Sequence, residues 1–210
     1  MKNTELLVLG IGNLLWADEG FGVRCIEALN AAYAFGSNVT LMDGGTQGLY
    51  LLPYVEDARR LIVFDAVDYG KAPGTLVVAT DDEVPRFMGA KKMSLHQTGF
   101  QEVIMSAALI DRLPQSMLLI GVQAQELEDY GGSLRDVVKA QIQPALEIAL
   151  QWATRWGVPY RKRAAALPCG GLNNAALQME AYEAGRPSAE AACRIGDDRV
   201  LAGRSYGSPE

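Results

Sequence analysis

Three residues far apart in the sequence, Glu19, Asp65 and His96, have side chains that commonly bind metals. Together they would supply two carboxylate oxygens and one imidazole nitrogen. That donor set suits a divalent first-row metal such as nickel, zinc or iron, and three protein ligands leave coordination positions open for a substrate. The three residues therefore indicate a site that a metal and a substrate could share.

Each of these residues also has a structural interpretation. His96 is the only histidine in the chain, and a lone histidine is more often a structural residue than a ligand, although a polar turn ahead of a predicted helix favours function. Asp43 and Asp65 could cap helices or close turns. Glu19 could stabilise the N-terminus of a following helix through its dipole. These structural roles explain each residue singly, but they explain less well why polar loops that follow several strands gather at one edge of a sheet.

The pattern of short apolar runs that alternate with helical stretches is typical of an α/β fold, in which helices cover both faces of a mostly parallel sheet. Ligands of such sheets bind beyond the carboxyl ends of the strands, where these polar residues lie. The expected strands are residues 5–9, 39–43, 60–64, 75–79 and 117–121. The expected helices are residues 21–32, 49–57, 98–112 and 133–156, with Ser133 as the cap of the last.

The hydrophobic pattern fades after Pro159. We therefore expect one domain over residues 1–159 and a loosely ordered C-terminal tail over residues 160–210. The formal charge of −6 argues against a nucleic-acid partner. Three cysteines without a C-x-x-C pair suit a reducing compartment, and no apolar run approaches the length of a membrane span. The composition thus predicts a cytoplasmic protein without membrane insertion.

The glycine-rich loop after the first strand could be mistaken for a dinucleotide-binding loop. Gly10 and Gly12 fit that fingerprint, but Leu15 stands where it needs a third glycine. Asp18 and Glu19 would also repel a pyrophosphate. A nucleotide-binding module is therefore an alternative, but the loop chemistry does not favour it.

Five motifs occur in an order that resembles the hydrogenase maturation endopeptidases, which process the large subunit of nickel–iron hydrogenases. The similarity covers about residues 4–157, and the tail with Ala191-Ala-Cys-Arg-Ile-Gly196 resembles the subset that serves uptake hydrogenases. The motifs are Gly10-x-Gly-Asn-x-Leu-x-x-Asp-Glu-Gly-x-Gly22, Asp43-Gly-Gly-Thr46, Asp65-Ala-Val-Asp-Tyr-Gly70, His96-Gln-x-Gly99 and Gly121-Val-Gln123.

The resemblance implies a three-layer sandwich, with a twisted sheet of about five strands between two layers of helices. It places nickel recognition on Glu19, Asp65 and His96, and it gives Asp43 a further role in activity. Family members cut the large-subunit precursor once near its C-terminus, only after nickel insertion, and release a short peptide. Ala124 stands where relatives often carry proline, which affects a loop and not a ligand.

A mechanism follows from the resemblance and from the donor set together. We expect nickel to arrive within the precursor and not as a resident cofactor, so that the incomplete site binds nickel already seated in its substrate. Asp43 is the candidate general base for the attacking water, with Asp65 or Glu19 as alternatives. The other function that the residues allow is a nickel-carrying or assembly chaperone that binds the large subunit without cutting it.

Overall fold

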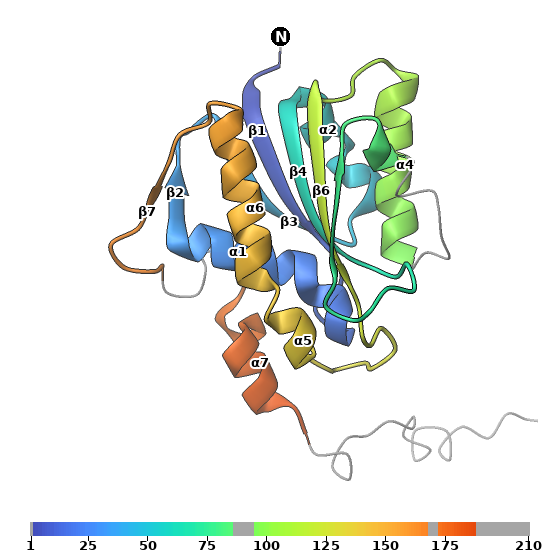
Figure 1. Cartoon of the computed structure of the whole chain (residues 1–210), viewed down its shortest axis with the longest axis vertical. Coiled ribbons are helices and arrows are strands. Elements are labelled where there is room, and N and C mark those ends of the chain that lie inside the picture. The colour runs from blue at the N-terminus through green and yellow to red at the C-terminus, as the bar shows by residue number, and fades with distance from the viewer. Residues whose placement is uncertain (1, 86–94, 168–171, 188–210) are drawn as a thin grey trace, which may run out of the picture.

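A five-stranded sheet forms the centre of the computed structural model, which describes residues 2–85, 95–167 and 172–187, residues 95–98 without their side chains. The strand order is β3-β1-β4-β6-β5, and all neighbours are parallel except β5, which runs antiparallel to β6 (Figure 1). The strands are β1 (Thr4–Ile11), β3 (Val39–Gly45), β4 (Ala58–Val67), β5 (Leu76–Thr80) and β6 (Ser116–Gln123). The predicted mostly parallel sheet is confirmed.

Helices cover both faces of this sheet, as the sequence predicts. On one face, α1 (Phe21–Ala32) and α6 (Ile142–Arg155) pack against the sheet around Phe64. On the other face, α2 (Leu52–Asp57) and α4 (Leu95–Leu109) pack around Val63 (Figure 1). Successive strand residues point to opposite faces, so the central strands are apolar on both sides.

The predicted single helix over residues 133–156 is wrong. Two helices occupy this region, α5 (Asp136–Lys139) and α6, and the chain breaks between them at Ala140. Pro144 explains the break, because it has no N–H to donate to the Ala140 carbonyl and its ring would collide with that oxygen in a continuous helix. Ser133 is not a cap either: its hydroxyl donates to Glu183, and Arg135 is the N-cap residue of α5.

Two other helices differ from prediction in their bounds. The predicted helix 49–57 is a 3-10 turn, η2 (Gly48–Leu51), that continues into α2. The predicted helix 98–112 begins earlier, at Leu95, so that His96 lies in the first turn of α4 and not in a turn ahead of it. A Cβ atom on Gly99 would lie only 3.3 Å from the Cα of Gly48, so the glycine lets α4 lie close to η2.

Described residues of the predicted tail contact the rest of the protein. Strand β7 (Tyr160–Lys162) pairs with β2 (Tyr33–Phe35), which follows α1. After residues 168–171, the chain forms the 3-10 turn η3 (Ala175–Leu177) and α7 (Met179–Gly185). The division at residue 160 stays a prediction. Among the helices that the structure describes, none is long and apolar enough to cross a membrane.

Candidate active site

The loop after β1 folds into the 3-10 turn η1 (Ala17–Gly20), which holds the first two acidic residues. Asp18 is fully buried and Glu19 is nearly so, with 9% of its surface exposed. The turn packs against β4, the strand that carries Asp65. Two predicted site residues, Glu19 and Asp65, therefore lie on neighbouring elements.

Asp18 has a structural role that the sequence did not reveal. One oxygen of its carboxylate accepts hydrogen bonds from the backbone N–H groups of Gln125 and Glu126, both at 2.8 Å, and the other accepts from the N–H of Arg135 at 2.7 Å. Hydrogen bonds to an ionised acceptor are stronger than neutral ones. Asp18 thus ties η1 to the loop after β6, and this holds the neighbouring Glu19 in place.

Two glycines of the first motif allow α1 to approach the sheet closely. A Cβ atom on Gly22 would collide with the backbone carbonyls of Ile11 and Phe64, and one on Gly10 would collide with the carbonyl of Gly22. The glycine pattern that resembles a nucleotide-binding loop is therefore explained by the packing of a helix N-terminus on two strand ends.

Asp65 lies within β4 near its carboxyl end and is 2% exposed. The loop that follows is anchored by the buried side chain of Gln123, whose amide oxygen accepts from Tyr69 N at 2.8 Å and from Lys71 N at 3.2 Å. Burial and the charge of Asp65 raise the pKa of Tyr69 to about 12. The last predicted motif, which ends at Gln123, thus supports the strand end that carries Asp65.

Asp43 points to the opposite face of the sheet from Asp65. It is the register partner of Gly10, which in turn is paired with Phe64. Phe64 packs on the α1 and α6 side, and paired residues of a sheet share a face whereas the next residue along a strand points away. Asp43 therefore faces α1, and Asp65 faces the side of α2 and α4.

The environment of Asp43 raises its pKa. Burial is the main cause, and the nearby carboxylate of Glu27 adds to it. Hydrogen bonds from the side chain of Asn173 and the backbone of Gly45, together with the charge of Arg24, oppose the shift. A carboxylate with a raised pKa is better suited to accept a proton than an exposed one.

His96 lies in the first turn of α4, on the face to which Asp65 points. Its side chain is outside the residues whose side chains are described. Among those that are described, no three His, Cys, Asp or Glu residues are grouped closely enough to hold a metal ion. The structure thus places Glu19, Asp65 and the backbone of His96 at one end of the fold, and the three-residue metal set stays a prediction.

Cys25 is the cysteine that the structure describes, and it is buried in α1. Burial raises the pKa of its thiol well above the ordinary value. The nucleophile of a cysteine enzyme is the thiolate, which such burial disfavours. Cys25 is therefore a packing residue, and Cys169 and Cys193 lie outside the described residues.

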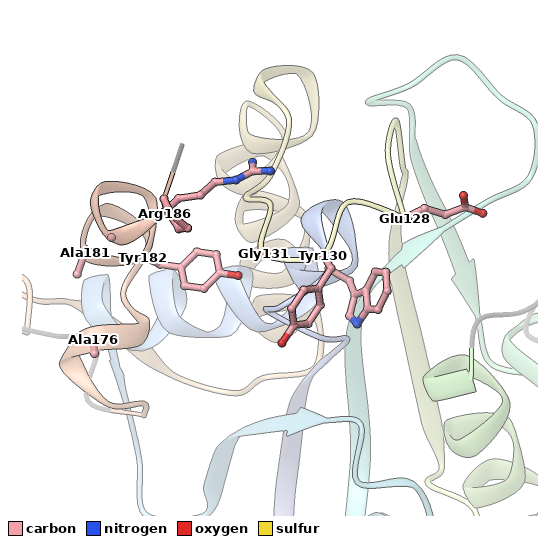
Figure 2. A pocket seen from close by; sticks show the side chains of 10 residues that line it. Glu128, Tyr130, Gly131, Ala176, Ala181, Tyr182 and Arg186 are labelled. Atoms are coloured by element: carbon pink, nitrogen blue, oxygen red, sulfur yellow. The ribbon is translucent and has the colours of Figure 1, made fainter. Parts of the chain in front are cut away.

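A pocket of about 700 Å³ opens beside η1. Trp16, which precedes η1, and Tyr130 form an edge-to-face pair with ring centroids 5.3 Å apart on one side of it. Tyr182 and Arg186 line the other side, and Figure 2 shows the Tyr182 ring directed from α7 towards Tyr130. The C-terminal part of the chain therefore helps to form the pocket that Trp16 and Tyr130 line.

A family model described as hydrogenase maturation protease matches residues 23–152. The chain belongs to this family. The protease is 58% identical over 201 residues to the hydrogenase expression/formation protein HupD of Thiocapsa roseopersicina, and the match covers 95% of this chain and 91% of that protein. The hydrogenase 2 maturation protease of Escherichia coli (strain K12) is 39% identical over 155 residues, which cover 73% of this chain and 93% of the relative.

The solved structure of the hydrogenase maturating endopeptidase HybD from E. coli has the same fold as the protease. The TM-score is 0.72 at 37% identity, over 77% of this chain and 99% of that chain. These likenesses confirm the family resemblance and the three-layer α/β fold, and they show that the protease is a peptidase. About a quarter of the protease has no counterpart in the HybD structure.

Proposed function

We propose that this protease removes the C-terminal extension of a nickel–iron hydrogenase large-subunit precursor after nickel insertion. Membership of the maturation protease family is the observation that carries the proposal. In its finer part, Glu19, Asp65 and His96 recognise the nickel of the precursor, and the ion is part of the substrate. A cytoplasmic location belongs to the same proposal, and a reduced, buried Cys25 is compatible with it.

The placement of the two carboxylates supports their role in nickel recognition. Glu19 and Asp65 are both buried, and they lie near the carboxyl end of a parallel sheet, where ligands of α/β proteins bind. The first turn of α4 brings His96 to the same end.

In the proposed mechanism, two carboxylates and one imidazole bind nickel that the precursor already holds. This contact places the scissile peptide bond at the sheet edge and so converts an encounter into a positioned attack. A metal ion can polarise the carbonyl or lower the pKa of a bound water. Asp43 is the proposed general base for the attacking water, because its carboxylate lies at this edge of the sheet and burial raises its pKa.

The cut itself is tested with purified nickel-loaded precursor and the intact mass of the large subunit before and after incubation. We expect a single shortening at the C-terminus and one released peptide. A stable complex with a precursor of unchanged mass would instead indicate the non-cleaving chaperone and would overturn the proposal.

A further inference from the structure

A polar network joins Asp43 to the C-terminal part of the chain. The Asn173 side-chain Nδ2 donates to Asp43 Oδ2 at 2.8 Å and to Glu27 Oε1 at 2.9 Å. Glu27 lies on α1 and Asp43 on β3, 130 residues before Asn173. A primary amide has two N–H groups, so a single side chain can hold both carboxylates.

The segment that carries Asn173, residues 172–187 (the C-terminal segment), is also tied to a buried charge. Arg24 of α1 is 3% exposed; its Nη1 pairs with Glu27 Oε2 at 2.9 Å and donates to the backbone oxygen of Leu177 at 2.6 Å. A buried guanidinium is tolerated only when its donors find acceptors. The carbonyl of Leu177 is one of these acceptors, so the C-terminal segment supplies a hydrogen-bond partner to the buried Arg24.

The far end of the C-terminal segment is attached to the loop around α5. Glu183 accepts hydrogen bonds from Ser133 at 2.8 Å and from Lys139 at 3.0 Å. Arg186 pairs with Asp129 at 2.9 Å. Exposed ion pairs contribute little one at a time, but with Asn173 and Leu177 they attach the segment at both ends.

Asn173 affects the two properties of Asp43 that matter for a base. Its hydrogen bond holds one carboxylate oxygen in a single direction. It also separates Asp43 from Glu27, whose like charge would otherwise face Asp43 directly and raise its pKa further. Among the residues that the structure describes, the charged side chains that act on Asp43 are Glu27 and Arg24, both on α1.

Only the C-terminal side of this network, with Asn173 and Leu177, lies beyond the residues that the family model matches, whereas Arg24, Glu27 and Asp43 lie within them. The family model ends at residue 152, and HybD is matched over 99% of its length while covering 77% of this chain. The match to the longer HupD relative, in contrast, covers 95% of this chain.

We propose that Asn173 is a positioning residue that holds the Asp43 carboxylate for peptide cleavage, so that the C-terminal segment completes the active site. This proposal rests on the proposed role of Asp43 as the base. The segment then does more than stabilise the fold, because it supplies a hydrogen bond that sets the direction and the charge state of a reacting group.

The test compares Asn173→Ala with Asn174→Ala in cleavage of nickel-loaded precursor between pH 5 and pH 8. Asn174 is the matched control, since it is the neighbouring residue of the same type and its side chain accepts from the backbone N–H of Ala176 at the start of η3. For Asn173→Ala we expect kcat to fall about tenfold, the effect of one lost hydrogen bond to a charged group, with KM within about twofold. Asn174→Ala should keep the parent values.

The pH profile gives the second readout. Without Asn173 the pKa of Asp43 rises further, and a base must be deprotonated to act, so the acid limb of kcat should move to higher pH. Equal effects of the two substitutions, or an unmoved acid limb, would overturn the positioning role. If Asn173→Ala does not fold, Asn173→Leu, which is similar in size and removes the donor without adding a charge, is measured in its place and should show the same upward movement.

A third variant separates this proposal from the one on which it rests. Asp43→Asn should be inactive. An active Asp43→Asn would remove Asp43 as the base, and both proposals about it would fail. An inactive Asp43→Asn beside an unaffected Asn173→Ala would overturn the positioning role alone.

Discussion

Among single residues, Asp18 and Glu19 are adjacent in sequence but serve different ends. Asp18 directs its carboxylate to three backbone N–H groups of the loop after β6, whereas Glu19 is one of the proposed nickel-recognising groups. The sequence shows two acidic residues side by side and does not distinguish them, because the partners of Asp18 lie 107 to 117 residues away. The structure therefore gives Asp18 a structural role that the motif alone does not distinguish from the role proposed for Glu19.

Replacement of Asp18 should weaken the fold. Asp18→Ala leaves three partly buried N–H groups without their acceptor, and we expect the free energy of unfolding to fall by about 3 kcal/mol. Urea denaturation followed by circular dichroism measures this change. The control is Asp82→Ala, on an exposed residue, which should change stability by less than about 0.5 kcal/mol. Equal stability of the two variants would contradict the anchoring role of Asp18.

Replacement of Glu19 or Asp65 should remove activity and leave the fold intact. Glu19→Gln and Asp65→Asn keep the size of the side chain but remove the negative charge that would bind nickel. We expect cleavage of nickel-loaded precursor to slow by about 100-fold or more, with little change in the circular dichroism spectrum. Glu102→Gln, on the exposed face of α4, is the control and should cleave normally. Normal cleavage by Glu19→Gln or Asp65→Asn would argue against that residue as a nickel ligand.

At the scale of the elements, the close approach of α1 to β1 and β4 positions the site. The approach depends on Gly10 and Gly22, which face each other across the contact. Since α1 also carries Arg24 and Glu27, a displacement of this helix would move the network around Asp43.

A methyl group at Gly22 should therefore be costly. Gly22→Ala would collide with backbone atoms that cannot rotate away, and overpacking of this kind costs about 1–3 kcal/mol. A thermal melt of the variant should show a lower Tm than the parent. Gly185→Ala, where a Cβ would meet nothing within 4 Å, is the control and should melt with the parent. Equal melting temperatures for the two variants would rule out the tight contact.

The sequence predicted most of these elements because their signals are local. Four strands and α1 are recognisable from buried apolar runs and from helical periodicity. The prediction of one helix over residues 133–156 was wrong because the apolar periodicity continues through Pro144, although this proline interrupts the backbone hydrogen bonds. The opposite orientations of Asp43 and Asp65 depend on the register with β1. The role of Asn173 depends on partners that are distant in sequence, so no local pattern indicates it.

At the scale of the whole molecule, the site is assembled from both ends of the chain. The first loop supplies Glu19, β4 supplies Asp65, and the C-terminal segment supplies the hydrogen bond to Asp43. The same segment lines the pocket beside η1 through Tyr182 (Figure 2). The groups proposed to recognise nickel and the proposed base thus lie on two faces of one sheet edge, where a substrate that carries its own metal could contact both.

Nickel dependence is the central claim, and it is measured most directly by the ratio of two initial cleavage rates. The protease is incubated with nickel-loaded and with nickel-free precursor of the same sequence, at equal concentrations, and the shortened large subunit is quantified over time. We predict a rate about 100-fold or more higher with nickel, because the metal positions the scissile bond. Equal rates for the two precursors would contradict nickel recognition by Glu19, Asp65 and His96.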